Sequence, residues 1–157
     1  MSSAPENGFD AAIVGGCGHV GLPLGLSLAD RGLRVALYDI DADVVELVSS
    51  GRMPFKETGT LELLERMLQA GRLEATTDPA AIARATTVIV VVGTPIDEHL
   101  NPAAHVVPDA IDEIRDHLRD GQLLILRSTV YPGVTAMVEA LVSRLGVDVD
   151  VAFCPER

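Results

Sequence analysis

Apolar residues follow two different spacings along this chain, and the two spacings alternate. Short, nearly continuous apolar runs rich in Val, Ile and Leu predict strands at residues 9–15, 33–38, 73–76, 87–93, 123–126 and 147–153. Between them, apolar residues spaced three and four positions apart predict helices at residues 18–30, 42–49, 60–70, 79–85, 108–120 and 135–145. Gly32, Gly71 and Gly121 follow three of these segments, where a glycine commonly ends a helix.

Strands that alternate with helices over short connections predict an α/β protein whose parallel sheet carries helices on both faces. We expect a doubly wound Rossmann fold with about six strands. Residues 88–92 are consecutive strand-favouring residues, so we expect this strand to be central. No internal repeat, low-complexity linker or change of composition marks a boundary, so residues 1–157 are predicted to form a single domain.

The composition narrows the classes of protein that fit. Hydrophobic residues make up 48% of the chain and aromatic residues only 3%, which predicts an aliphatic core. A net charge of -11 argues against nucleic-acid partners, because phosphate contacts need clustered Lys and Arg. No apolar stretch reaches the roughly 18 residues of a membrane span, and the N-terminus lacks the pattern of a signal peptide. With only Cys17 and Cys154, far apart in sequence, we expect a reduced, cytoplasmic protein.

Residues 16–21 carry the pattern G-x-G-x-x-G, directly after the first predicted strand and at the start of the first predicted helix. There, the three glycines allow a tight turn, a close approach of backbone to a pyrophosphate, and close packing of helix on strand. Backbone N–H groups at the helix start would face the anion. We therefore predict a dinucleotide-binding loop made of Gly16, Cys17, Gly18, His19, Val20 and Gly21. The alternative is a glycine-rich turn needed only for packing.

Asp39 ends the second predicted strand, where a Rossmann fold places the acid that accepts hydrogen bonds from the adenosine ribose diol. A carboxylate there repels a 2′-phosphate, and the neighbours Ile40 and Asp41 offer no arginine to receive one. The sequence therefore predicts NAD as the cofactor, in preference to NADP. The alternative is that Asp39 only caps the next helix, although Asp41 is better placed for that role.

Five stretches of sequence, taken together and in order, are more specific than the glycine loop alone. They are GGCGHVGLPL at residues 15–24, YDID at 38–41, GTP at 93–95, RSTVYPGVT at 127–135 and CPER at 154–157. Together they resemble the N-terminal domain of the UDP-glucose/GDP-mannose dehydrogenase family. The family also carries G-L-P in its loop, which matches Pro23 in the second turn of the predicted helix. The loop and CPER are most similar to the branch that oxidises UDP-N-acetylmannosamine.

The resemblance adds site residues at the ends of the fourth, fifth and sixth predicted strands. These residues are Gly93, Thr94, Pro95, Ser128, Thr129 and Glu156. The resemblance implies that Thr94 lines the cofactor pocket and that Thr129 lies beside the nicotinamide and a catalytic water. It implies that Glu156 assists proton transfer and thioester hydrolysis. The alternatives are a plain turn at residues 93–95, hydroxyls that cap the following helix, and a solvated carboxylate at residue 156.

Other polar residues give weaker signals. Glu57 matches an acid that the family shows before its third helix, and an exposed loop charge is the alternative. Many members carry a basic residue shortly after the ribose acid, whereas residues 43–45 here are Asp, Val and Val. The four histidines have no metal-binding spacing, so no metal site is predicted. Neither Cys17 nor Cys154 matches the family's nucleophile.

The resemblance implies a two-step oxidation of a nucleotide-sugar CH₂OH to a carboxylate, with two NAD⁺ and a cysteine that carries thiohemiacetal and thioester intermediates. The family's cysteine, its oxyanion-stabilising lysine and its sugar-binding residues belong to a central helix and a C-terminal domain, which this sequence does not match. We therefore expect this chain to bind NAD without turnover, as part of a longer enzyme that forms a homodimer or a larger homo-oligomer. The alternatives are another NAD-dependent dehydrogenase, of the 3-hydroxyacyl or 6-phosphogluconate type, and a non-catalytic NAD-binding module.

Overall fold

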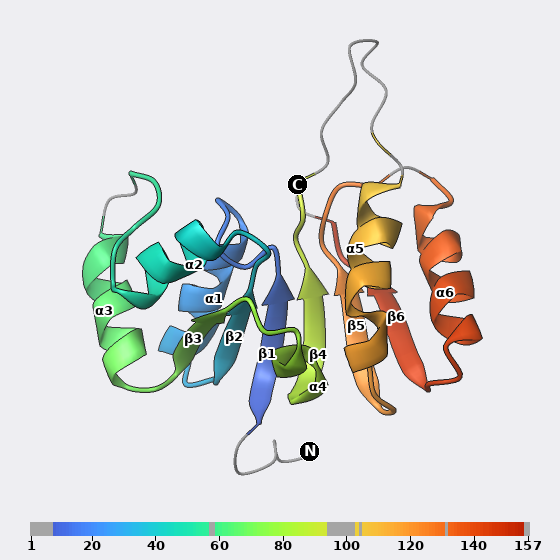
Figure 1. The fold of residues 1–157 in the computed structure, drawn as a ribbon, viewed down its shortest axis with the longest axis horizontal. Helices are drawn as coiled ribbons and strands as arrows, with labels where there is room; N and C mark the ends of the chain where they lie inside the picture. Colours follow the sequence, from blue (N-terminus) through green and yellow to red (C-terminus); the bar gives the residue numbers. More distant parts are fainter. Residues whose placement is uncertain (1–7, 57–58, 94–102, 104, 131, 156–157) are drawn as a thin grey trace.

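The structure is a computed structural model, and it describes residues 8–56, 59–93, 103, 105–130 and 132–155. Within these ranges strands and helices alternate from one end of the chain to the other (Figure 1). In order, the elements are β1 (Phe9–Val14), α1 (Gly21–Asp30), β2 (Val35–Tyr38), α2 (Ala42–Ser49), α3 (Thr60–Gln69), β3 (Leu73–Thr76), α4 (Ala80–Ala83), β4 (Ala85–Val90), α5 (Val106–Ile114), β5 (Gln122–Leu126), α6 (Val134–Arg144) and β6 (Val149–Phe153).

The strands form one parallel sheet of six, in the order β3-β2-β1-β4-β5-β6. This is the strand order of a doubly wound Rossmann sheet, so the predicted fold class is confirmed. β4 lies in the middle of the sheet, next to β1, as predicted for residues 87–93 (Figure 1). Val14 pairs with Tyr38 on one side and with Val90 on the other, so β1, β2 and β4 end at the same edge. The strand order reverses between β1 and β4, and ligands of such sheets bind at this switch point.

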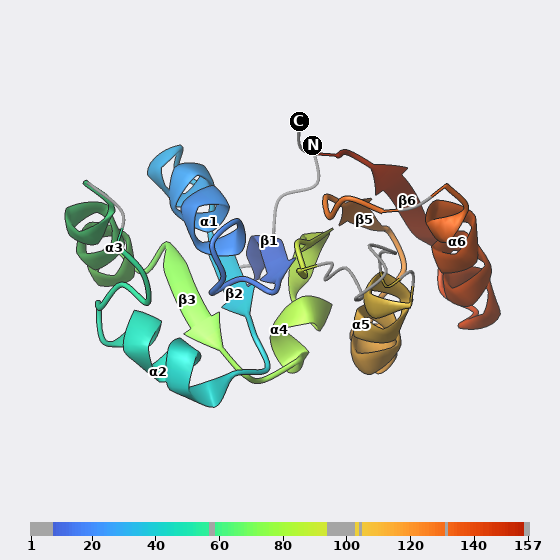
Figure 2. The ribbon, with the colours of Figure 1, turned by 90° about the horizontal axis from the view of Figure 1, so that it is seen from above.

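Helices cover both faces of the sheet and enclose two aliphatic cores. One core contains side chains of α4, α5 and α6, among them the fully buried Ile82 and Ile111. The other contains side chains of α1, α2 and α3, among them Leu22 and Leu64. Figure 2 shows α1 on one side of the sheet and α4 and α5 on the other. Because both faces are covered, the central strands read as continuous apolar runs in the sequence.

Several predicted boundaries were wrong, among them three at elements that border the site. α1 begins at Gly21 and not at residue 18, so Pro23 lies in its first turn, where a missing N–H costs no helical hydrogen bond. α5 begins at Val106, two residues before Pro108, and gives way to a 3-10 turn at Arg115–His117. β4 ends at Val90, although the N–H of Val91 still donates to the carbonyl of Val14. No helix in the described ranges has the length and apolarity to cross a bilayer.

Candidate functional site

The glycine loop leaves β1 at Val14 and is tied to the end of β2 before it enters α1. The N–H groups of Gly15 and Gly16 both donate to the carbonyl oxygen of Tyr38, at N–O distances of 3.0 Å. Gly15 has a φ of +76°, in the left-handed region that favours glycine. The turn from strand to helix is therefore held against β2, as its sequence pattern predicts.

The three glycines of the pattern have different surroundings. A Cβ at Gly16 would lie 2.7 Å from the carbonyl oxygen of Ile13 and from the Cα of Leu37, and a Cβ at Gly21 would overlap the carbonyl oxygen of Gly15. These two glycines are required by packing. A Cβ at Gly18 would meet only the carbonyl oxygen of Gly15, at an ordinary contact distance of 3.5 Å, and Gly18 lines an open cavity. The fold therefore does not require a glycine at position 18.

The backbone N–H groups that follow in the loop are available for a ligand. The N–H of Gly18 makes only a long hydrogen bond, of 3.4 Å, to the carbonyl oxygen of Gly15. Within the described residues, the N–H groups of His19, Val20 and Gly21 have no hydrogen-bond acceptor. The first turn of α1 contains no acidic residue, so the positive end of the helix dipole is not neutralised there. Such a helix start binds anions such as phosphate.

Asp39 lies at the end of β2 and contacts this loop. Its Oδ2 accepts a hydrogen bond from the N–H of Cys17 at 3.1 Å, and its Oδ1 accepts one from the N–H of Asp41 at 3.3 Å. The helix cap is a different residue, because Oδ1 of Asp41 accepts hydrogen bonds from the N–H groups of Asp43 and Val44, at 3.1 and 3.2 Å. The alternative that Asp39 serves as the cap of α2 is therefore wrong.

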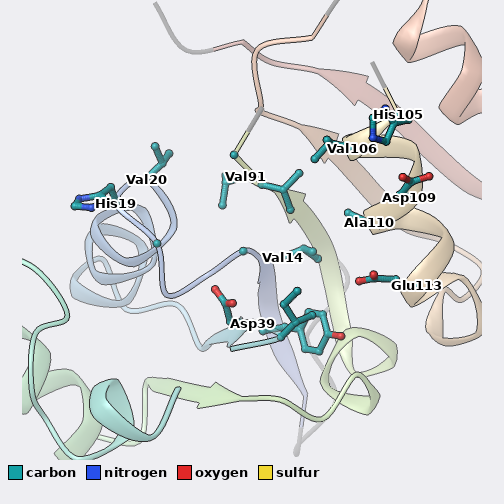
Figure 3. A pocket seen from close by; sticks show the side chains of 16 residues that line it. Val14, His19, Val20, Asp39, Val91, His105, Val106, Asp109, Ala110 and Glu113 are labelled. Atoms are coloured by element: carbon teal, nitrogen blue, oxygen red, sulfur yellow. The ribbon is translucent and has the colours of Figure 1, made fainter. Parts of the chain in front are cut away.

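The loop, Asp39 and the start of α5 surround one cavity of about 590 Å³ (Figure 3). It lies at the switch point, above the ends of β1, β2 and β4. Five residues of the predicted site line it: Gly18, His19, Val20, Asp39 and, three residues after β4, Gly93. Other residues that line the cavity have no role predicted from the sequence: Tyr38, Ile40, His105, Val106, Asp109, Ala110 and Glu113.

The cavity is negatively charged. Asp39, Asp109 and Glu113 line it, and no Lys or Arg does so within the described residues. Burial raises the pKa of Tyr38, and the charges of Glu113 and Asp39 raise it further. Beneath the loop, burial raises the pKa of Cys17 to about 12, with smaller contributions from Asp39 and Asp41. The negative charges of the cavity therefore oppose a 2′-phosphate beside Asp39. The Cys17 thiol stays protonated at neutral pH.

An aromatic contact supports the glycine loop from outside. The imidazole ring of His19 stacks on the ring of Phe55, with ring centroids 4.1 Å apart and an interplanar angle of 27°. Phe55 belongs to the connection between α2 and α3. The stack therefore joins the loop to a connection that lies far from it in the sequence.

Other predicted residues are less directly placed in the cavity. The side chain of Cys17 is buried in the core formed with α1, α2 and α3, and Gly16 and Gly21 pack against backbone.

The buried hydroxyl of Ser128 donates to the carbonyl oxygen of Val92 at 2.8 Å and so joins the end of β5 to that of β4. Thr129 is exposed next to it. Neither hydroxyl caps α6, because Gly133 is at its N-cap, so that alternative is wrong. Glu57, Thr94, Pro95 and Glu156 lie outside the described residues.

The model of the UDP-glucose/GDP-mannose dehydrogenase family, NAD binding domain, matches residues 11–157. The chain belongs to this family. A UDP-N-acetyl-D-mannosamine dehydrogenase of Methanococcus aeolicus is 32% identical, over 100% of this chain and 36% of that protein. A GDP-mannose 6-dehydrogenase of Pseudomonas syringae pv. syringae is 34% identical, over 90% of this chain and 34% of that protein. The chain thus spans about a third of the length of these relatives.

Solved structures agree with this assignment. A GDP-mannose dehydrogenase of Pseudomonas aeruginosa, solved as a ternary complex, superposes with a TM-score of 0.87 at 29% identity, over 94% of this chain and 36% of that one. A UDP-glucose dehydrogenase of Pyrobaculum islandicum gives a TM-score of 0.85 at 30% identity, over 99% of this chain and 38% of that one. A 3-hydroxyisobutyrate dehydrogenase of Mycobacterium tuberculosis shares the fold alone, at 20% identity and a TM-score of 0.61. The chain is an NAD-binding Rossmann domain of the nucleotide-sugar dehydrogenase type.

Proposed function

We propose that this chain holds NAD across the carboxyl edge of its sheet and is the cofactor domain of a nucleotide-sugar dehydrogenase. The observation that carries the proposal is the meeting of unpaired loop amides and the Asp39 carboxylate on one cavity at the switch point. The amides of His19, Val20 and Gly21 bind the pyrophosphate. Asp39 accepts hydrogen bonds from the adenosine ribose diol and excludes a 2′-phosphate.

The surroundings of Gly18 support the fit of a dinucleotide. No packing contact requires a glycine there, and any side chain would project where the backbone borders the cavity. The bare backbone lets a pyrophosphate approach the unpaired amides closely. NAD supplies the hydride acceptor when it is bound. The chain contributes the anion-binding loop, the ribose acid and the cavity that orients the cofactor.

For the nicotinamide half we propose the residues that the family resemblance adds. They are Gly93, Thr94, Pro95, Ser128, Thr129 and Glu156. Ser128 acts indirectly, because its hydroxyl holds the ends of β4 and β5 together. We propose that Thr129 and Glu156 have catalytic roles beside the nicotinamide, Thr129 with a water and Glu156 in proton transfer. Thr129 lies three residues after β5 and is exposed, so its hydroxyl can meet a bound group.

The proposed reaction is oxidation of the CH₂OH group of a nucleotide-sugar to a carboxylate with two NAD⁺. We propose UDP-N-acetylmannosamine as the substrate. A relative named for that sugar is aligned over the whole of this chain, although relatives named for GDP-mannose have similar identity. This chain covers only about a third of such relatives, so we propose that it binds NAD without turnover by itself. We further propose that the full-length enzyme is cytoplasmic and forms a homodimer or a larger homo-oligomer.

An NMR titration tests the proposed cofactor site. When NAD⁺ is added to a ¹⁵N-labelled sample of the chain, the amide signals of His19, Val20 and Gly21 should shift most, together with those around Asp39. Amides at the amino ends of β5 and β6, at the edge of the sheet opposite the cavity, serve as the internal control. Shifts confined to other parts of the chain would show that the pyrophosphate does not bind at the start of α1.

A second assay tests the reaction and the substrate. NADH formation is followed with UDP-N-acetylmannosamine, UDP-glucose or GDP-mannose, using this chain and, separately, the product of the complete gene. We expect no turnover by the chain and turnover of UDP-N-acetylmannosamine by the gene product, which light scattering should show to be a dimer or a larger oligomer. Turnover by the chain alone would contradict the proposal that it only binds NAD. Preference for another sugar would contradict the proposed substrate.

A further inference from the structure

The wall of the cavity opposite Asp39 is formed by one face of α5. Val106, Asp109, Ala110 and Glu113 all line the cavity. Asp109 and Ala110 follow Val106 by three and four positions, and Glu113 follows them by four and three, so the four residues share that face of the helix. Figure 3 shows Asp109 and Glu113 on this wall and Asp39 on the other side of the open space. The sequence motifs assign no role to either carboxylate of α5.

Apolar side chains line the space between the two walls, which we call the slot. Ile40 follows the ribose acid directly, lines the cavity and is 73% exposed, which is unusual for so large an apolar side chain in this fold. Ala110 and Val106 provide apolar surface on the α5 wall. A planar apolar group that bridges these side chains would bury Ile40. A base attached to a ribose held by Asp39 is in position to do so.

Glu113 is the last residue of this wall along α5, and it lies across the cavity from Asp39 (Figure 3). Tyr38 is 7% exposed and lines the same cavity immediately before Asp39 in the chain. The negative charge of Glu113 adds to the burial that raises the pKa of Tyr38. Glu113 and Asp39 therefore line the cavity from two sides. A base that extends from Asp39 into the slot presents its outer edge to Glu113.

We propose that Glu113 accepts a hydrogen bond from the exocyclic amine of adenine and thereby selects NAD over dinucleotides with a carbonyl oxygen at that position. The inference rests on the proposed placement of the adenosine beside Asp39. An ionised carboxylate only accepts hydrogen bonds, so it matches the amine of adenine and repels the carbonyl oxygen of hypoxanthine. Sites that bond one such group reject an analogue that lacks it, because their own polar group is then left unpaired.

The test compares NAD⁺ with nicotinamide hypoxanthine dinucleotide, titrated separately into the chain by calorimetry. The unmodified chain should bind the hypoxanthine compound at least about tenfold more weakly, which corresponds to the loss of one charge-assisted hydrogen bond. In Glu113→Gln the side-chain amide can donate to the carbonyl oxygen as well as accept from the amine. The preference should then fall below about threefold, while Asp39 still holds the ribose of both compounds.

Two further variants control for charge and for position. Asp112→Asn removes the same charge from α5, but Asp112 pairs with Arg115 at 2.9 Å and does not line the cavity, so the tenfold preference should remain. Asp109→Asn tests the other carboxylate of the wall. A preference lost in Asp109→Asn but kept in Glu113→Gln would overturn the assignment, as would equal binding of the two compounds by the unmodified chain. Absence of NAD⁺ binding altogether would overturn the proposed function as well.

Discussion

The carboxylate of Asp39 accepts a hydrogen bond from the backbone N–H of Cys17, with 3.1 Å between Oδ2 and the nitrogen. Asp39 ends β2 and Cys17 lies in the middle of the glycine loop, 22 residues earlier in the chain. The same carboxylate therefore lines the cavity and holds the loop in place. A change at Asp39 should affect both the shape of the loop and the binding of the ribose.

Substitution of Asp39 separates these two effects. Asp39→Ala should weaken NAD⁺ binding by at least about 1 kcal/mol and lower the stability of the fold by a similar amount, because the N–H of Cys17 loses its acceptor. Asp39→Asn keeps a side-chain oxygen for that N–H, so its melting temperature should remain close to that of the unmodified chain. It should, however, discriminate less against NADP⁺, because the negative charge is gone. Calorimetry and thermal denaturation measure the two properties. Undiminished NAD⁺ binding by Asp39→Ala would contradict the proposed role.

The glycines of the loop should respond differently to a single methyl group. Gly18→Ala should fold normally, since its Cβ meets only an ordinary contact, but it should weaken NAD⁺ binding by tenfold or more, on the order of 1.4 kcal/mol. Gly21→Ala should destabilise the fold by roughly 1–3 kcal/mol, because its Cβ would overlap the carbonyl oxygen of Gly15. Circular dichroism melts and calorimetry distinguish the two variants. Normal binding by a folded Gly18→Ala variant would show that the pyrophosphate does not approach this backbone.

The buried thiol of Cys17 predicts a pH dependence of stability. Its pKa in the folded chain is raised to about 12. The pKa of an unfolded cysteine is about 8.5. Above about pH 8.5 the unfolded chain loses this proton while the folded chain keeps it, so the free energy of unfolding should fall as the pH rises towards 12. Below that window Cys17 should contribute no pH dependence. Denaturation curves across the range should show a smaller fall for Cys17→Ala than for the unmodified chain, and equal slopes would contradict the prediction.

Gln122 offers a test of the fold that leaves the cofactor site alone. Gln122 is only 4% exposed. Its Nε2 group donates to the carbonyl oxygens of Ile82 and Ala85, both at 2.8 Å. The Oε1 atom accepts a hydrogen bond from the N–H of Arg119 at 2.7 Å. Gln122→Leu should cost roughly 1–3 kcal/mol of stability, because these buried groups lose their partner. The exposed Gln69→Leu is the matched control and should change stability by about 0.5 kcal/mol or less. A melting temperature of Gln122→Leu equal to that of the control would contradict the prediction.

The sequence predicted the sheet and the glycine loop because local signals specify both. Continuous apolar runs such as residues 88–92 are typical of central parallel strands, and the pattern G-x-G-x-x-G occurs only once in the sequence. Helix starts were less accurate, since Pro23 and Pro108 both fit a first turn that begins two residues before them. The pattern of apolar positions does not distinguish a first turn from the preceding loop.

The wall formed by α5 could not be predicted in the same way. Asp109 and Glu113 lie on a polar helix face, and which part of that face borders the switch point depends on how α5 packs against β4 and β5. Ile40 did carry a signal, because a large apolar residue directly after the ribose acid has no core position available to it. The hydroxyl of Ser128 was given a cofactor role, whereas its bond to the Val92 carbonyl arises from the pairing of two strand ends.

The central claim, that Asp39 and the loop amides form a site for NAD, is tested most directly by titrating the unmodified chain with NAD⁺ and with NADP⁺ under the same conditions in a calorimeter. We predict binding of NAD⁺ and binding of NADP⁺ that is at least about tenfold weaker, because a 2′-phosphate would lie against a carboxylate in a cavity without a lining Lys or Arg among the described residues. Equal or tighter binding of NADP⁺ would contradict the account.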